Sequence, residues 1–111
     1  MSSMKELVEY IHQHMTNSRI TAEEISHTIG ISHSSLYRKI KGMTGQSLSE
    51  FIRYIRLQHA EQLLAVGKLS VSEVMFKVGF TNHSYFSKCF KQQFEFTPGD
   101  YLKKGNGSEP G

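Results

Sequence analysis

The sequence has few of the residues that interrupt helices or crosslink chains. Proline occurs only at Pro98 and Pro110 among 111 residues, so nearly the whole chain is free to be helical. Cys89 is the single cysteine, which excludes an internal disulfide and a cysteine-based zinc site and is typical of a reducing compartment. The six histidines have no clustered partners, so we predict neither a metal site nor a cofactor.

Long hydrophobic runs and catalytic patterns are missing as well. No apolar run approaches the roughly 20 residues that a membrane-spanning helix needs, and the N-terminus lacks the pattern of a signal peptide. We therefore predict a cytoplasmic domain without membrane contact. Paired carboxylates in a plausible pocket, a Ser-His-Asp or Cys-His arrangement and a phosphate-binding glycine loop are also absent from the sequence, so we do not predict an enzyme.

Acidic residues are missing from two long windows. The net charge is only +3, but no Asp or Glu occurs between Glu24 and Glu50, and none between Glu73 and Glu95. Chance clustering is the alternative, but two basic windows without acids indicate two surfaces that face a polyanion. The basic residues that these two windows contain include Arg38, Lys39 and Lys41 in the first, and Lys77, Lys88 and Lys91 in the second.

What remains is a helical pattern, without the apolar-polar alternation of strands. Residues 4–15 carry apolar residues at helical spacing. Thr21, Ser47 and Ser70 each precede a glutamate by three residues, the spacing of a capping box at a helix start. Ser32 and Asn82 are further helix caps, glycines near residues 30, 42, 67 and 79 end helices, and Thr97-Pro98 begins a short last one. The sequence predicts an all-α fold of about seven helices.

The chain also repeats itself. Ile29-Gly30-Ile31 corresponds to Val78-Gly79-Phe80 at a shift of 49 residues. Thr81 is one extra turn residue, and after it the shift is 50 residues, which pairs Arg38 with Lys88. Each copy is a short helix, a glycine-containing turn, a polar cap and a second helix, which is the pattern of a helix-turn-helix unit. A single such pattern is weak, but two copies with matching basic positions are a much stronger indication.

In a helix-turn-helix unit the second helix needs one apolar stripe for the core and an opposite polar or basic stripe for the DNA groove. The core stripes are Leu36 and Ile40 in the first copy, and Phe86, Phe90 and Phe94 in the second. The polar stripes point away from the core. For each of their residues, the alternative to a DNA contact is an ordinary solvated surface position. We predict that DNA is contacted by His33, Ser34, Tyr37, Arg38 and Lys41, and by His83, Ser84, Ser87, Lys88 and Lys91.

The roles of these residues follow from their chemistry. Arg38 can donate two hydrogen bonds to a guanine edge, and Lys88 can reach a guanine or a phosphate. Lys41 and Lys91 are predicted phosphate contacts, which position the domain without reading sequence. The helix that joins the two copies would be about 30 Å long, close to the roughly 34 Å pitch of B-DNA. It could place two recognition helices in successive major-groove segments.

Three segments carry a family resemblance: residues 35–41, residues 50–64 and residues 78–98. The last begins with Val78-Gly79-Phe80 and ends with Thr97-Pro98. Together they resemble the DNA-binding domain of AraC/XylS-type bacterial activators over about residues 5–104. The resemblance implies a monomeric seven-helix domain that binds double-stranded DNA and activates transcription, with RNA polymerase as a further partner. It is most similar to the C-terminal output domain of hybrid two-component sensors or response regulators, whose full-length protein would form a dimer.

The sequence departs from that family at two positions. Met75 stands where the family usually has alanine, at a tight helix contact, and Glu95 stands where it usually has glycine. Glycine there would permit a left-handed turn, so we expect this turn to be strained or differently shaped.

The predicted organisation has four parts. A first unit spans residues 4–45, a linker helix residues 46–67, a second unit residues 68–104, and a disordered tail residues 105–111. For Arg53 and Arg56 on the linker helix, we expect structural pairing with nearby acids. The alternative function is a helical protein-interaction module without specific DNA readout, which would require a broad exposed apolar groove.

Overall fold

The structure is a computed structural model that describes residues 3–107, and the described part is helical throughout, with connecting turns and no strand. The all-α prediction is confirmed. In chain order the helices are α1 (Ser3–Gln13), α2 (Ala22–Ile29), α3 (His33–Thr44), α4 (Leu48–Val66), α5 (Val71–Lys77), α6 (His83–Phe94) and α7 (Pro98–Gly107).

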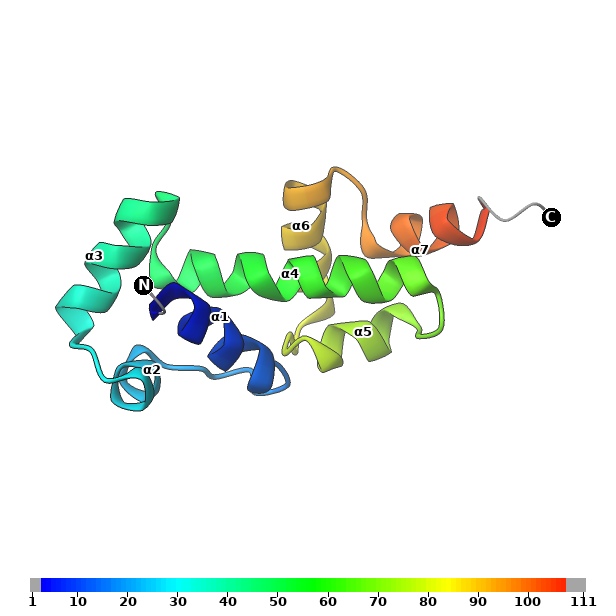
Figure 1. Ribbon diagram of the computed structural model, residues 1–111. Coiled ribbons are helices and arrows are strands. Elements are labelled where there is room, and N and C mark those ends of the chain that lie inside the picture. The colour runs from blue at the N-terminus through cyan, green and yellow to red at the C-terminus, as the bar shows by residue number, and fades with distance from the viewer. Residues whose placement is uncertain (1–2, 108–111) are drawn as a thin grey trace.

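Helix α4 is the axis of the molecule. Helices α1, α2 and α3 gather around its N-terminal half, and α5, α6 and α7 around the remainder, with α7 running alongside its C-terminal half (Figure 1). At 19 residues, α4 is about 28 Å long, in agreement with the expected spacer. We call α1–α3 the first unit and α5–α7 the second unit.

The predicted helix caps are present. Ser32 and Asn82 accept hydrogen bonds from the backbone N–H groups of Ser35 (3.2 Å) and Tyr85 (2.8 Å). The three predicted capping boxes also form: Thr21 with Glu24, Ser47 with Glu50, and Ser70 with Glu73. In the last two boxes, hydrogen bonds from the backbone N–H of the serine lower the pKa of Glu50 and of Glu73.

Several helix ends differ from the predicted ones. Helix α1 ends at Gln13 rather than at residue 15, and α3 continues past Gly42 to Thr44, where Gly45 takes the left-handed conformation (φ 75°). Helix α7 extends to Gly107, into the segment for which we predicted a disordered tail; residues 108–111 lie outside the described residues. The helix pattern there was missed because glycine and polar residues are weak helix formers.

One continuous apolar cluster runs along α4 and joins the two units. The predicted core stripes are buried in it: Leu36 and Ile40 are at most 1 % exposed, and Phe86 and Phe90 are fully buried. Phe94 packs against the cluster while partly buried, with its ring centroid 4.6 Å from that of Phe90. Tyr101 closes the C-terminal end of this core through a hydrogen bond from its hydroxyl to Glu61, and this bond raises the pKa of Tyr101.

The two family departures have visible consequences. Met75 is accommodated in the core at 3 % exposure. Glu95 ends α6 in the left-handed conformation (φ 71°, ψ 3°), nearly the same as Gly45 at the end of α3 (φ 75°, ψ 2°). The turn therefore keeps its shape, and a residue with a Cβ carries the strain of a conformation that favours glycine. None of the helices in residues 3–107 is long and apolar enough to cross a membrane.

Candidate nucleic-acid interface

Helix α3 presents a single polar face to solvent. Ser34, Tyr37, Arg38 and Lys41 lie at positions i, i+3, i+4 and i+7, and all four are exposed. His33 is the first residue of the helix and is exposed as well. The helix carries no acidic residue, so its outer face combines basic and neutral donors with the positive end of the helix dipole.

Helix α6 repeats this face at the same spacing. Ser84, Ser87, Lys88 and Lys91 again occupy positions i, i+3, i+4 and i+7, and His83 begins the helix. Ser87 is half-buried, whereas the other four are exposed. The helix has no acidic residue before its cap at Glu95. The sequence repeat thus becomes two equivalent polar stripes on two helices, each opposite a buried apolar stripe.

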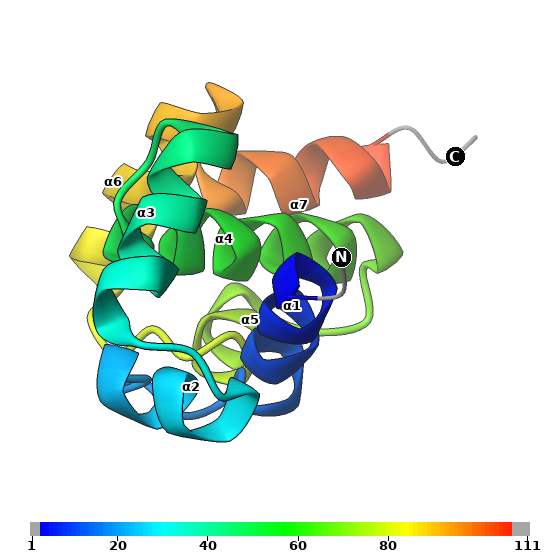
Figure 2. The same ribbon diagram turned by 60° about the vertical axis from the view of Figure 1, so that its left-hand side comes forward.

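The two helices lie on the same side of the molecule. Helix α3 stands at the N-terminal end of α4 and α6 midway along it, and both run across its direction (Figure 1). Turned by 60°, α3 lies in front of α6 at the upper left (Figure 2). Because both stand on one side of a straight helix, their N-terminal ends can approach one extended ligand together.

Matching turns precede α3 and α6. In the first unit, the N–H of Ile31 donates to the carbonyl of Ser26 (3.2 Å); in the second, the N–H of Phe80 donates to Met75 (3.0 Å). Gly30 and Gly79, directly before these donors, both have positive φ values. These are the hydrogen bonds of a glycine-ended helix, and their identity in both units explains why the repeat is visible at a shift of 49 residues.

Two of the predicted DNA-contacting residues have other neighbours in the structure. The ammonium group of Lys41 donates to the carbonyl oxygen of Gly45 (3.2 Å), so it caps the C-terminus of α3 and must turn away to meet a phosphate. Its charge also contributes to lowering the pKa of Glu50, after the hydrogen bonds from Ser47. Ser87 is the second of these residues, because its side chain is half-buried and is therefore less accessible to DNA.

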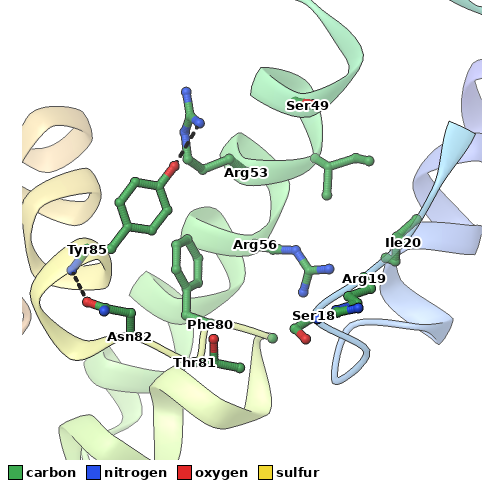
Figure 3. A pocket seen from close by; sticks show the side chains of 12 residues that line it. Ser18, Arg19, Ile20, Ser49, Arg53, Arg56, Phe80, Thr81, Asn82 and Tyr85 are labelled. Atoms are coloured by element: carbon green, nitrogen blue, oxygen red, sulfur yellow. Dashed lines mark hydrogen bonds between the residues drawn. The ribbon is translucent and has the colours of Figure 1, made fainter.

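A groove of about 390 Å³ separates the two units on the N-terminal half of α4 (Figure 3). Its lining contains three arginines and no acidic residue. Arg53 donates to the hydroxyl of Tyr85 (3.1 Å), which joins α4 to α6. Arg19 lies across the groove on the segment before α2 and is exposed. The lining residues are Ser18, Arg19, Ile20, Ser49, Ile52, Arg53, Arg56, Gly79, Phe80, Thr81, Asn82 and Tyr85.

Sequence reasoning did not select Arg19 or Arg53 as DNA contacts. Arg19 falls just outside the acid-free window, and nothing in the local pattern separates it from other surface charges. Tyr85 and Arg53 are 32 residues apart, a distance that helical periodicity cannot bridge. The usable signal was Arg53 itself, a basic residue one turn from a second arginine in a helix between two units that the sequence predicts to face DNA.

Our expectation for Arg56 was wrong. Its guanidinium is buried (6 % exposed) and bonds to backbone carbonyls: to Met15 and Val78 through Nη1 and to Asn17 through Nη2, each at 2.6 Å. Burial lowers the pKa of Arg56, but an arginine remains charged inside proteins. The carbonyl oxygens therefore take the place of the acid that we expected.

The fold and the paired stripes agree with known proteins. A family model described as a helix-turn-helix domain matches residues 25–104. The chain belongs to the AraC-type helix-turn-helix family. It is therefore a DNA-binding transcription regulator domain, and the family is not an enzymatic one.

Individual relatives support this assignment. A "Histidine kinase P4" of Formosa agariphila is 37 % identical over 101 residues, which cover 91 % of this chain and 7 % of that protein. The C-terminal domain of AraT, a response regulator from Geobacillus stearothermophilus, has a TM-score of 0.80 at 28 % identity, over 94 % of this chain and 86 % of that one. The "HTH-type transcriptional regulator MtrA" of Neisseria gonorrhoeae is 40 % identical over 75 residues, 68 % of this chain and 25 % of that protein. The chain thus spans less than a third of the curated relatives named here.

Proposed function

We propose that the chain reads two successive major-groove segments on one side of a DNA duplex, with α3 in one and α6 in the other. The observation that supports this is the pair of equivalent polar stripes, which stand on the same side of one straight helix (Figures 1 and 2). Helix α4 holds both helices, with α3 at its N-terminal end and α6 midway along it, and major-groove segments on one side of B-DNA repeat every 34 Å or so.

Within each segment the residues divide the work. Arg38 reads a guanine through two hydrogen bonds, and Lys88, at the equivalent position, contacts a guanine or a phosphate. Ser34, Tyr37 and Ser84 lie beside them on the same stripes and contact base edges or methyl groups. His33 and His83 approach phosphates at the helix starts. Lys91 also contacts a phosphate, and Lys41 does so once its ammonium group has left the carbonyl of Gly45. Ser87 has the smallest role because it is half-buried.

The groove between the units fits the same proposal. Between two major-groove segments the duplex presents its phosphate backbone, and the groove offers the guanidinium groups of Arg19 and Arg53 with no carboxylate among its lining residues. The hydrogen bond to Tyr85 positions the guanidinium of Arg53 beside α6. These two arginines add contacts that strengthen binding to any sequence and steepen its salt dependence.

The chain acts as the output domain of a larger signalling protein in the cytoplasm. Support comes from the relatives: the histidine kinase contains the similar region as 7 % of its length, and AraT is a response regulator whose C-terminal domain has this fold. Activation is supported by a "Lactose operon transcription activator" of Staphylococcus xylosus, 35 % identical over 82 residues. As an activator, the chain would contact RNA polymerase. On its own it would be a monomer, whereas the full-length protein would be a dimer.

A protein-interaction module without DNA readout is the weaker proposal. It requires a broad exposed apolar groove, whereas the groove between the units is lined by three arginines and several polar side chains. The exposed large apolar side chains include Met43 on α3, Val66 at the end of α4 and Phe76 on α5, which stand on three different helices.

Selection from a random duplex library tests the proposed function. The purified chain should enrich a motif with two blocks about one helical turn apart. Fluorescence anisotropy at two salt concentrations should then show binding that weakens steeply with salt. A single enriched block would leave one unit with a structural role only, and no binding at low salt by a folded chain would favour the protein-interaction module.

A further inference from the structure

The two units make little contact with each other. Helices α1 and α3 pack on α2 and on α4, and α5, α6 and α7 pack on one another and on α4, but no helix of the first unit packs extensively on a helix of the second within the described residues. Between the helices of the two units, the apolar packing therefore runs through the linker helix. Apolar side chains are not directional, so this packing permits each unit to rock on α4.

Arg56 adds a directional link at this point. From the middle of α4 its guanidinium donates to Met15 and Asn17, in the segment between α1 and α2, and to Val78, the residue after α5. Figure 3 shows the guanidinium pointing from α4 toward the segment that carries Ser18 and Arg19. One planar group thus bonds both units, and its fixed fork of donors leaves little freedom in their relative orientation.

Gly79 shows how closely the second unit approaches this group. A Cβ atom built on Gly79 would lie 1.6 Å from Nη1 of Arg56 and 2.4 Å from the carbonyl oxygen of Met15. The turn of the second unit therefore passes within contact of both the arginine and the first unit. At the equivalent Gly30, a Cβ would meet nothing within 4 Å.

We propose that Arg56 is a positioning residue that locks the two helix-turn-helix units at one relative orientation and so sets the spacing of the two DNA blocks that the chain reads together. The spacing part rests on the proposed function; the locked orientation does not. A lysine at this position keeps the charge but offers a single compact ammonium, which cannot reproduce the planar fork across three carbonyls.

The lock is tested first without DNA. Spin labels are placed on Glu23→Cys in α2 and Ser72→Cys in α5, two exposed and equivalent positions away from the polar stripes, in a Cys89→Ala background. We expect a narrow distance distribution for wild type and a clearly broader or shifted one for Arg56→Lys. Arg53→Lys is the control and should keep a narrow distribution, because Arg53 lies three residues earlier on the same helix and its side chain donates to Tyr85 within the second unit. An Arg56→Lys distribution as narrow as wild type, at the same distance, overturns the proposal.

The spacing is tested on duplexes whose two blocks are moved apart one base pair at a time. Wild type should bind best at one spacing, and Arg56→Lys should reduce the affinity ratio between the best and the neighbouring spacings several-fold, because a looser link lets the second unit reach blocks at neighbouring spacings. A purely structural loss of folded protein would weaken all spacings alike. A broadened distance distribution with an unchanged spacing profile would refute the DNA part alone, and absence of wild-type binding would refute the proposed function instead.

If Arg56→Lys does not fold, alanine substitutions at Gly30 and Gly79 test the locked orientation instead. Gly79→Ala and Gly30→Ala place a Cβ on similar positive-φ backbones, but only the first displaces Arg56. We expect broadening of the distance distribution in Gly79→Ala alone. Equal distributions in the two variants overturn the lock.

Discussion

The two helix-turn-helix units share their cap and turn conformations but differ in side chains, and the second has one extra turn residue, Thr81. Their recognition helices both end in a left-handed residue, Gly45 in the first unit and Glu95 in the second. Their turns both contain a positive-φ glycine, but Gly30 faces open space, whereas Gly79 presses against Arg56. The local rules of capping and turning thus produce the same shape twice, and the tertiary contacts of that shape differ between the units.

Substitutions of the two turn glycines should show the largest difference in stability between a turn with local contacts only and one with tertiary contacts. Gly30→Ala should lower the free energy of unfolding by about 1–2 kcal/mol, the cost of a left-handed residue with a Cβ. Gly79→Ala should lower it by about 3 kcal/mol or more, because it also disturbs a charged hydrogen bond of Arg56. Urea unfolding followed by circular dichroism measures both, and equal losses would mean that the second turn is no closer to the linker than the first.

The recognition positions should differ in DNA binding. Arg38→Ala should lose about 1–3 kcal/mol on the selected duplex and relax specificity in one block only. Lys88→Ala should lose less, about 1 kcal/mol, because a lysine makes one point contact where arginine makes two parallel bonds. Anisotropy titrations on the selected and on scrambled duplexes provide the comparison, with the exposed Lys68→Ala at the other end of α4 as control. If Arg38→Ala keeps wild-type affinity and preference, the first recognition helix is misplaced.

The caps of α3 and α6 should respond in opposite directions. Glu95→Gly should raise the free energy of unfolding by about 1 kcal/mol, since glycine adopts the left-handed conformation without the Cβ penalty. Gly45→Ala should lower it by a similar amount in the first unit. Thermal unfolding of the two variants checks this, and destabilisation by Glu95→Gly would show that its side chain makes a contribution larger than the strain.

The smallest effect concerns acid stability at the start of the second unit. The pKa of Glu73 is lowered by hydrogen bonds from Ser70, so the carboxylate stabilises the fold above its ordinary pKa of 4.5, and this contribution is lost as the pH falls through the folded-state pKa. Glu73→Gln should therefore flatten the stability profile between about pH 5 and 3. Ser70→Ala should flatten it less, because it removes only the hydroxyl of Ser70 and keeps the backbone N–H that donates to the Glu73 carboxylate. Chemical unfolding at several pH values measures this; an unchanged slope in both variants would contradict the assignment.

Sequence reasoning succeeded where the determinants are local. The caps at Thr21 and Ser70, the turn glycines and the opposed stripes of α3 and α6 all follow from spacing within a dozen residues. The family resemblance also singled out Glu95, where we expected a strained or differently shaped turn and the structure keeps the left-handed shape. Whether the stripes contact DNA as assigned stays a prediction.

The rest depended on contacts between distant segments. Arg56 bonds residues 41, 39 and 22 positions away, and no helical period indicates that a buried arginine will select carbonyl oxygens over an acid. The arginine-lined groove likewise needs three separate segments to meet. Such sites become visible only when the packing of both units on α4 is known.

Hydroxyl-radical footprinting of the chain on its selected duplex tests simultaneous insertion of both recognition helices most directly. Two protected tracts on one side of the duplex, about 10 base pairs apart, are expected for wild type. Arg38→Ala should weaken one tract and Lys88→Ala the other. A single tract that both variants weaken equally, or that only one of them affects, would contradict the claim that the two units read DNA together.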